Sequence, residues 1–148
     1  MKPWLTPSGV VLDGNQFSEL NRRKRTDKPA VGWTGVGHVV RGNVVASSPH
    51  AAFKGTGNDC LFEHNVLTHL CYETIDTGAF YVGRSWNQRG NVARFNTFDT
   101  IRPTKRLAQQ SCSQNAFYLD DQMSGWHIWN NTFYNCMTGT FIGGGEHN

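Results

Sequence analysis

The sequence predicts an all-β fold, a right-handed parallel β-helix of about 4–5 coils, on three observations. The first is composition: the 148 residues include 16 glycines and 12% aromatic residues, with few of the runs that favour helices. The second is a repeated segment built around an asparagine, and the third is a repeated segment built around a phenylalanine. The length suits one domain, so we expect a single β-helix over residues 1–148, with residues 1–8 as an irregular lead-in.

Five segments share the pattern apolar-x-x-Asn-x-apolar. The asparagines are Asn15, Asn43, Asn65, Asn96 and Asn131. The apolar residues three positions earlier are Leu12, Val40, Phe62, Ala93 and Ile128, and those two positions later are Phe17, Val45, Leu67, Phe98 and Phe133. Asparagine tolerates the left-handed or bridge conformation of a sharp bend, and its amide can bond to the next one. The pattern therefore predicts an Asn ladder that runs through successive coils.

The second repeat aligns residues 52–55, 79–82, 116–119 and 140–143 without gaps. Because side chains alternate along a strand, one row is expected to point into the core. This inward row is Phe53, Phe80, Phe117 and Phe141, and the outward row is Lys54, Tyr81, Tyr118 and Ile142. The preceding alanines, Ala52, Ala79 and Ala116, are expected beside the outward row, where they leave room. An antiparallel sandwich, the competing fold, would show hairpin turns every 8–12 residues or so and no asparagine row.

Irregular segments are predicted near residues 20–30, 71–78, 83–90 and 102–115, where the spacing between repeats increases. The segments 71–78 and 102–115 precede the phenylalanine strand in two coils, and residues 83–90 and 120–125 follow it. Loops on both sides of one strand predict a groove with that strand as its floor.

The groove is predicted to bind a polysaccharide, whose C–H faces stack on aromatic rings while its hydroxyls bond to charged groups. The candidate substrate-binding residues are Lys54, Tyr81, Tyr118, Glu73, Trp86 and Arg89, and the candidate catalytic residues are Asp76, Asp120, Asp121 and Arg84. The simpler interpretation is that the tyrosines cover a β-helix face and that the aspartates cap turns.

Two reactions fit these residues. A glycoside hydrolase needs two carboxylates, about 5–5.5 Å apart for retention or about 6.5–9.5 Å for inversion. Asp76 and either Asp120 or Asp121 would lie on adjacent coils, about 4.8 Å apart. A polysaccharide lyase needs a base and a cation that neutralises a uronate, either an arginine or calcium held by acids. Calcium is therefore the one cofactor to consider, and no metal ligands are assigned.

The formal charge of +3 is mild, and the basic cluster at residues 22–25 is interpreted as a solvated loop, so no nucleic acid partner is expected. The four cysteines, Cys60, Cys71, Cys112 and Cys136, lack zinc-ligand spacing. They permit two disulfides, or they remain free thiols. No signal peptide or membrane span is evident, which predicts a cytoplasmic protein, or a secreted one if the chain is a fragment.

Several blocks resemble the right-handed β-helix repeat proteins of the pectate-lyase-like superfamily. They are residues 49–53, 57–59, 73–84, 89–91, 118–121 and 143–148, and the similarity covers roughly residues 8 to 148. The resemblance implies a carbohydrate partner, because that superfamily holds lyases, hydrolases and epimerases as well as non-catalytic binding proteins. It carries over no catalytic motif.

Such relatives are usually longer and capped, whereas bare ends of a β-helix invite association into homo-oligomers. The leading hypothesis is a carbohydrate-active β-helix that binds, and as an enzyme cleaves, an acidic polysaccharide. The alternative is a non-catalytic glycan-binding or structural assembly module, including a shortened paralogue of a larger enzyme.

Overall fold

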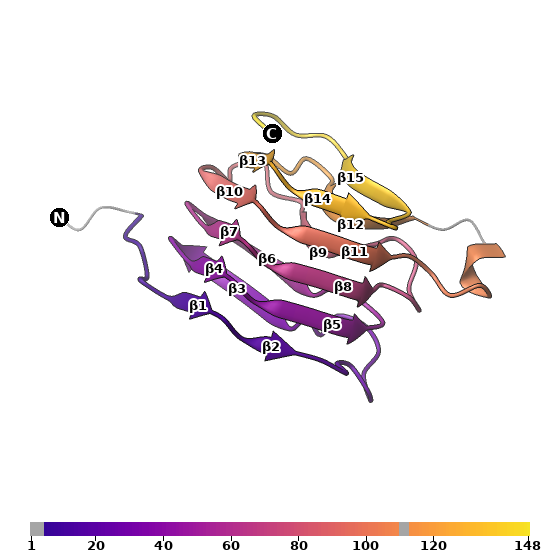
Figure 1. Ribbon diagram of the computed structural model, residues 1–148. Helices are drawn as coiled ribbons and strands as arrows, with labels where there is room; N and C mark the ends of the chain where they lie inside the picture. The colour runs from indigo at the N-terminus through magenta and orange to yellow at the C-terminus, as the bar shows by residue number, and fades with distance from the viewer. Residues whose placement is uncertain (1–4, 110–112) are drawn as a thin grey trace.

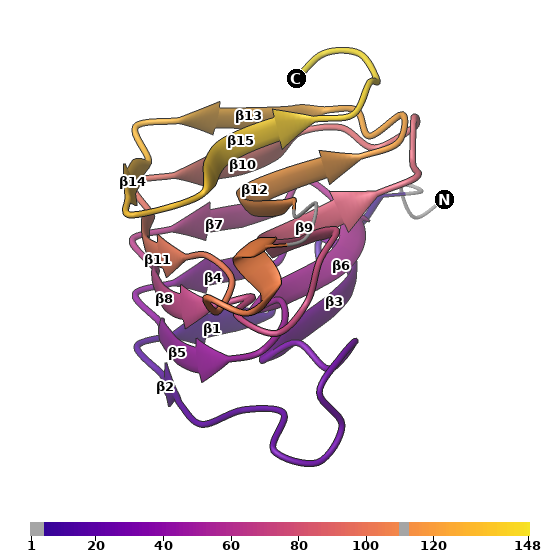
Figure 2. The ribbon, with the colours of Figure 1, turned by 90° about the vertical axis from the view of Figure 1, so that its right-hand side faces the viewer.

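The computed structural model describes residues 5–109 and 113–148. The described chain winds as a right-handed parallel β-helix of about five coils, each of which contributes one strand to each of three parallel sheets (Figures 1 and 2). Sheet A contains β1 (Val11–Asp13), β4 (Val39–Arg41), β7 (Leu61–Glu63), β10 (Asn91–Arg94) and β13 (Trp126–Trp129). Sheet B contains β2 (Gln16–Phe17), β5 (Val44–Ser48), β8 (Val66–Leu70), β11 (Thr97–Ile101) and β14 (Thr132–Tyr134). Sheet C contains β3 (Val31–Val36), β6 (Phe53–Asn58), β9 (Thr77–Gly83), β12 (Gln114–Asp120) and β15 (Thr138–Ile142). The predicted fold class is confirmed.

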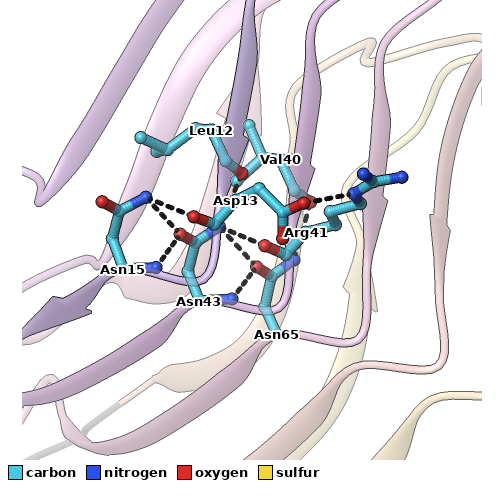
Figure 3. Close-up of polar contacts among 7 residues, drawn as sticks. All are labelled: Leu12, Asp13, Asn15, Val40, Arg41, Asn43 and Asn65. Carbon is cyan, nitrogen blue, oxygen red and sulfur yellow. Dashed lines mark hydrogen bonds and ion pairs between the residues drawn. The ribbon is translucent and has the colours of Figure 1, made fainter.

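The asparagine ladder lies between sheets A and B, and Figure 3 shows its first three members. The Asn43 Nδ2 donates to Asn65 Oδ1 at 3.0 Å, and the same oxygen accepts the backbone N–H of Asn43 at 3.0 Å. The pattern repeats from Asn15 to Asn43, from Asn65 to Asn96 and from Asn96 to Asn131. The ladder therefore satisfies buried backbone groups that no strand pairs at the bend.

The left-handed residue of this bend is the one before the asparagine, which corrects our expectation. None of the five asparagines has a positive φ, whereas the residues before them have φ between 51° and 68°. These residues are Gly14, Gly42, His64, Phe95 and Asn130. The physical reason is that the asparagine side chain must point inward to bond the next coil, so the turn is made one residue earlier. A second left-handed column follows four residues after each asparagine, at Glu19, Ser47, His69, Thr100 and Asn135.

The two apolar columns beside the ladder are in the predicted register. Leu12 pairs with Val40, Val40 with Phe62, Phe62 with Ala93, and Ala93 with Ile128. The column two residues after the asparagine is likewise continuous from Phe17 to Phe133. Val45, Leu67 and Phe98 are fully buried, so these columns form the core on the side of sheets A and B.

The inward phenylalanine column in sheet C holds three of its four predicted members. Phe53 pairs with Phe80, and Phe80 pairs with Phe117, with which it stacks at 4.3 Å between ring centroids. Phe141 was predicted in this column, and that prediction is wrong. Phe117 pairs with Thr140, and Phe141 pairs with Tyr118, so Phe141 lies on the outer face and is 43% exposed. A one-residue shift in register moves a side chain to the opposite face of a sheet.

The first strand of sheet C, β3, was not recognised in the sequence. Its Trp33 packs on Phe62 and Phe80 with ring centroids 4.6 and 5.5 Å apart. Its neighbour in register is Gly55, where an added Cβ would lie 2.3 Å from the indole ring. The core at this end therefore depends on the packing of the Trp33 ring against Gly55, where there is no side chain to obstruct it.

We expected the alanines before the phenylalanine column to lie on the outer face and to leave an open floor there, and the structure corrects this. Ala52, Ala79 and Ala116 are fully buried and belong to the hydrophobic core cluster. Because they pack inside, they leave no room on the outer face.

Long loops lie before and after the strands of sheet C. The Thr104 N–H donates to the carbonyl of Tyr72, and Gln114 Nε2 donates to the carbonyl of Thr74, which joins the two loops that precede β9 and β12. A short 3₁₀ helix, η1 (Leu107–Gln109), lies in the second of these loops and protrudes from the sheets in Figure 1. In the loops that follow β9 and β12, the Ser124 N–H donates to the carbonyl of Ser85.

The cysteines Cys60, Cys71 and Cys136 are free thiols, and Cys112 lies outside the described residues. No helix in the described ranges is long and apolar enough to cross a membrane.

Candidate functional site

The outer face of sheet C carries a column of large side chains in register. Lys54 pairs with Tyr81, Tyr81 with Tyr118, and Tyr118 with Phe141. The tyrosine rings meet edge to face at 5.4 Å, and Lys54 Nζ lies 4.9 Å from the centroid of the Tyr81 ring. Tyr118 is only 7% exposed, so the accessible ring surface is narrower than the predicted floor.

Each tyrosine hydroxyl is bound to an aspartate from a neighbouring coil. The Tyr81 hydroxyl donates to Asp120 Oδ2 at 2.6 Å, and the Tyr118 hydroxyl donates to Asp76 Oδ1 at 2.9 Å. Asp120 ends β12, and Asp76 immediately precedes β9, so the two carboxylates approach the tyrosine pair from opposite ends of the strands. We call these four residues the Tyr–Asp cluster.

Both tyrosines in the Tyr–Asp cluster have raised pKa values. Burial raises the pKa of Tyr81 most, and its hydrogen bond to Asp120 raises it further. Burial also raises the pKa of Tyr118, followed by its hydrogen bond to Asp76 and the negative charge of Asp120. Both hydroxyls therefore remain protonated at neutral pH and donate to the carboxylates. Because the two tyrosine rings are in contact, the two carboxylates lie around one tyrosine pair.

Two glycines make room for the Tyr–Asp cluster. A Cβ on Gly78 would lie 2.6 Å from Tyr118 Cβ, and a Cβ on Gly83 would lie 2.8 Å from Asp120 Cβ. The Cβ on Gly83 would also lie 3.2 Å from the Tyr81 hydroxyl oxygen. The distances of 2.6 and 2.8 Å are shorter than real Cβ atoms show, so any side chain at Gly78 or Gly83 would displace the cluster.

Two predicted binding residues are engaged by the loop at residues 20–30. Lys54 Nζ lies 2.7 Å from Asp27 Oδ1, and Glu73 is paired with Arg25, whose Nε donates to Glu73 Oε2 at 2.8 Å. The hydrogen bond from Lys54 lowers the pKa of Asp27, and the hydrogen bond from Arg25 lowers the pKa of Glu73. Sequence reasoning missed Asp27 and Arg25, because nothing in a solvated loop indicates which coil it will contact.

Arg84 and Asp121 form the rim next to the Tyr–Asp cluster. Their Nε and Oδ2 atoms are 3.5 Å apart, and both side chains are well exposed. The Arg84 N–H donates to the carbonyls of Asp120 and Asp121, which fixes this rim to β12. Asp76 and Arg84 both have left-handed backbones, with φ of 51° and 61°. Strained non-glycine residues of this kind often cluster at functional sites.

Trp86 and Arg89 lie outside the Tyr–Asp cluster. Trp86 is 76% exposed and lines a depression of about 570 Å³ with Gln122, Ser124 and Glu146. Arg89 is exposed on the corner before β10, where its backbone N–H donates to Asn58 Oδ1. A second depression, of about 530 Å³, covers the Lys54 end of the tyrosine column and reaches Trp33 and Gly83. The two depressions share no lining residue, and Tyr81 and Gly83 belong to the second.

The arrangement offers two carboxylates, one exposed guanidinium and the accessible edge of a tyrosine column. Within the described ranges no three His, Cys, Asp or Glu side chains gather into a metal-binding group. Hydroxyl-rich ligands suit these groups, because a carboxylate accepts hydrogen bonds from hydroxyls and a ring edge packs on C–H groups.

Comparisons of the chain with protein-family models, with curated proteins and with solved structures find no significant match in any of the three.

Proposed function

We propose that the outer face of sheet C binds a polysaccharide chain at the Tyr–Asp cluster. The observation that carries the proposal is the pair of hydrogen bonds from Tyr81 to Asp120 and from Tyr118 to Asp76. Each tyrosine holds one oxygen of its aspartate, and Oδ1 of Asp120 also accepts the backbone N–H of Asp121 at 3.0 Å, so both carboxylates are fixed in orientation toward a ligand hydroxyl. Such preorganised acceptors lower the entropic cost of binding a flexible sugar chain.

The charge balance indicates which sugar units the cluster accepts. Among the described residues, Lys54 and Arg84 are paired with Asp27 and Asp121, and neither Asp76 nor Asp120 forms an ion pair. We therefore expect units with free hydroxyls at the cluster. A uronate, the unit predicted from the sequence, would be accepted at Arg84, where the exposed pair with Asp121 can be replaced at little cost.

The resemblance of this sequence to the pectate-lyase-like superfamily supports a carbohydrate ligand, and we include membership of that superfamily in the proposal. The fold is compatible with it, because a long parallel sheet presents one residue of each coil at regular spacing to a linear polymer.

A binding experiment on the full chain tests this proposal. Isothermal titration with neutral and uronate-containing polysaccharides should give binding that falls at least about tenfold in Asp76→Asn and in Asp120→Asn. Asp99→Asn is the matched control, because Asp99 lies on sheet B and should leave the affinity unchanged. Equal loss in all three variants, or no loss in the first two, would contradict the proposal.

Hydrolysis of the bound chain is a second candidate function, favoured by one observation. Asp76 and Asp120 come from successive coils and accept hydrogen bonds from two tyrosines whose rings are in contact, and a pair of carboxylates is what a glycoside hydrolase uses. New reducing ends without unsaturated ends would support hydrolysis, and unsaturated ends would indicate a lyase instead. Polysaccharide binding without either product would leave the binding function alone.

A further inference from the structure

A second column of aromatic rings lies away from sheet C, at the bend between sheets A and B. His64 stacks on Phe95 with ring centroids 5.1 Å apart and an interplanar angle of 10°, and Phe95 meets Trp129 edge to face at 5.1 Å. The three residues come from successive coils. Phe95 is 39% exposed and Trp129 is 42% exposed, so the column faces solvent. We call His64, Phe95 and Trp129 the ring column.

The backbone conformation at Phe95 is unfavourable for a bulky side chain. Phe95 occupies the left-handed position of the asparagine bend, with φ of 54°, and the same position is Gly14 and Gly42 in the first two coils. A bulky residue at positive φ is a clear outlier that costs free energy, whereas glycine adopts the conformation readily. The chain therefore bears a conformational cost at this bend and places an exposed ring there. Strain of this kind points to function.

A polar pair accompanies the rings. Arg94 Nη2 lies 2.8 Å from Glu63 Oε2, and the guanidinium carbon lies 5.7 Å from the Phe95 ring centroid and 5.4 Å from that of Trp129. Trp129 occupies the next position of this outward row, in register with Arg94. A depression of about 500 Å³ borders Trp129 and is also lined by His127 and His147. Trp129 thus links the ring column and the Arg94 guanidinium to this depression.

The charges decide the class of ligand. Arg94 is neutralised by Glu63, and Arg41 in the same row is neutralised by Asp13, so a polyanion such as a nucleic acid finds no net positive charge here. The apolar surface is confined to the rings and is interrupted by the ion pair, unlike the continuous apolar centre of a protein interface. An uncharged sugar matches both features, since its C–H face packs on a ring and its hydroxyls bond to the charged pair.

We propose that the ring column is a second carbohydrate-binding site, which takes an uncharged sugar unit against Trp129 with Glu63 and Arg94 as its hydrogen-bonding partners. This site is independent of the Tyr–Asp cluster, because it uses other sheets and other residues. Binding at the two sites can therefore be lost separately.

The test maps binding by NMR of the indole and amide groups in the full chain, titrated with cello-, manno- and xylo-oligosaccharides. We expect shifts at Trp129 and Phe95 with at least one of these, and an affinity lower by about tenfold or more in Trp129→Ala. Phe95→Gly should also weaken binding while leaving the chain folded, because glycine suits this backbone position.

Two controls make the outcome decisive. Tyr134→Ala removes an aromatic residue that is 68% exposed on sheet B and should leave the affinity at the ring column unchanged. The double variant Asp76→Asn/Asp120→Asn should keep the shifts at Trp129 even where it abolishes binding on sheet C. The proposal is overturned if none of the three oligosaccharides shifts Trp129, or if Trp129→Ala binds as the unmodified chain does.

Discussion

Each buried asparagine of the ladder forms hydrogen bonds with backbone and amide groups of neighbouring coils at the bend, where strand pairing is interrupted. Asn65 is 1% exposed, and its side-chain oxygen accepts both the backbone N–H and the side-chain amide of Asn43. Its Nδ2 donates to the carbonyl of Val40 and to Asn96 Oδ1. Four groups on two other coils therefore depend on one side chain, which explains why the repeat tolerates loops of different length yet keeps this residue in every coil.

Replacing Asn65 with alanine should destabilise the fold by about 3 kcal/mol, because it leaves several buried donors and acceptors unpaired. Asn15 is the matched comparison, since it lies at the end of the ladder, is partly exposed and serves one neighbour. We expect a loss of only about 1 kcal/mol for Asn15→Ala. Urea unfolding of both variants measures the difference, and equal losses would show that the ladder is not the stabilising element.

The raised pKa values of Tyr81 and Tyr118 predict how stability depends on alkaline pH. An unfolded tyrosine releases its proton near about pH 10, whereas these two keep theirs to higher pH in the folded chain. Their contribution to the free energy of unfolding is thus fully present below about pH 10 and is lost as pH rises above it. Urea midpoints measured from about pH 9 to about pH 11 should fall more steeply for the unmodified chain than for Tyr81→Phe/Tyr118→Phe. Parallel curves would mean that neither burial nor the aspartates raise the two pKa values in the folded chain.

The sequence predicted the positions of some residues in the fold and not those of others. The asparagines and their apolar neighbours were predictable, because five copies of one pattern leave little freedom in register. The left-handed turn was assigned to the asparagine instead of to the residue before it, since glycine occupies that position in only two coils, at Gly14 and Gly42. The turn at Phe95 could not be predicted, because phenylalanine rarely adopts a left-handed backbone conformation. Asp27 and Arg25 were missed because their partners lie in later coils.

At the scale of the strand, register decides which face a side chain occupies. The sequence at residues 140–143 resembles the earlier phenylalanine segments, yet Phe141 aligns with Tyr118 and continues the outer column edge to face at 5.0 Å. The pattern could not reveal the one-residue shift, because the loop before each strand varies in length and one phenylalanine fits either face. The strand β3 was missed for a related reason: Val31 stands where the next coil has Phe53, and Trp33 stands where it has Gly55, so β3 lacks the repeated pattern.

Gly55 is the glycine on which this end of sheet C depends. Gly55→Ala should destabilise the fold by about 2 kcal/mol, because the added Cβ would lie 2.3 Å from the Trp33 ring and 2.5 Å from the Trp33 carbonyl oxygen. Gly32 lies on the same sheet, and a Cβ there would meet atoms no closer than 3.8 Å. Gly32→Ala should therefore change stability by no more than about 0.5 kcal/mol. Thermal unfolding compares the two variants, and a larger loss for Gly32→Ala would refute the packing described for Trp33.

At the scale of the whole molecule, the β-helix brings distant parts of the chain onto two separate faces. Sheet C carries the Tyr–Asp cluster, and the bend between sheets A and B carries the ring column. The sequence predicted that Tyr81, Tyr118, Asp76 and Asp120 would lie near one another, because the repeats fix which positions stack. It could not predict which hydroxyl bonds to which carboxylate, since that depends on where each loop enters the strand.

The central claim is that polysaccharide binds on sheet C at the tyrosine pair. Selective labelling of the tyrosine rings tests it most directly, because Tyr81 and Tyr118 lie in the Tyr–Asp cluster while Tyr134 lies on sheet B. On titration with a polysaccharide that binds, we predict shifts of the Tyr81 and Tyr118 ring signals, no shift of Tyr134, and loss of the two shifts in Asp76→Asn/Asp120→Asn. Binding that leaves Tyr81 and Tyr118 unshifted would contradict the account.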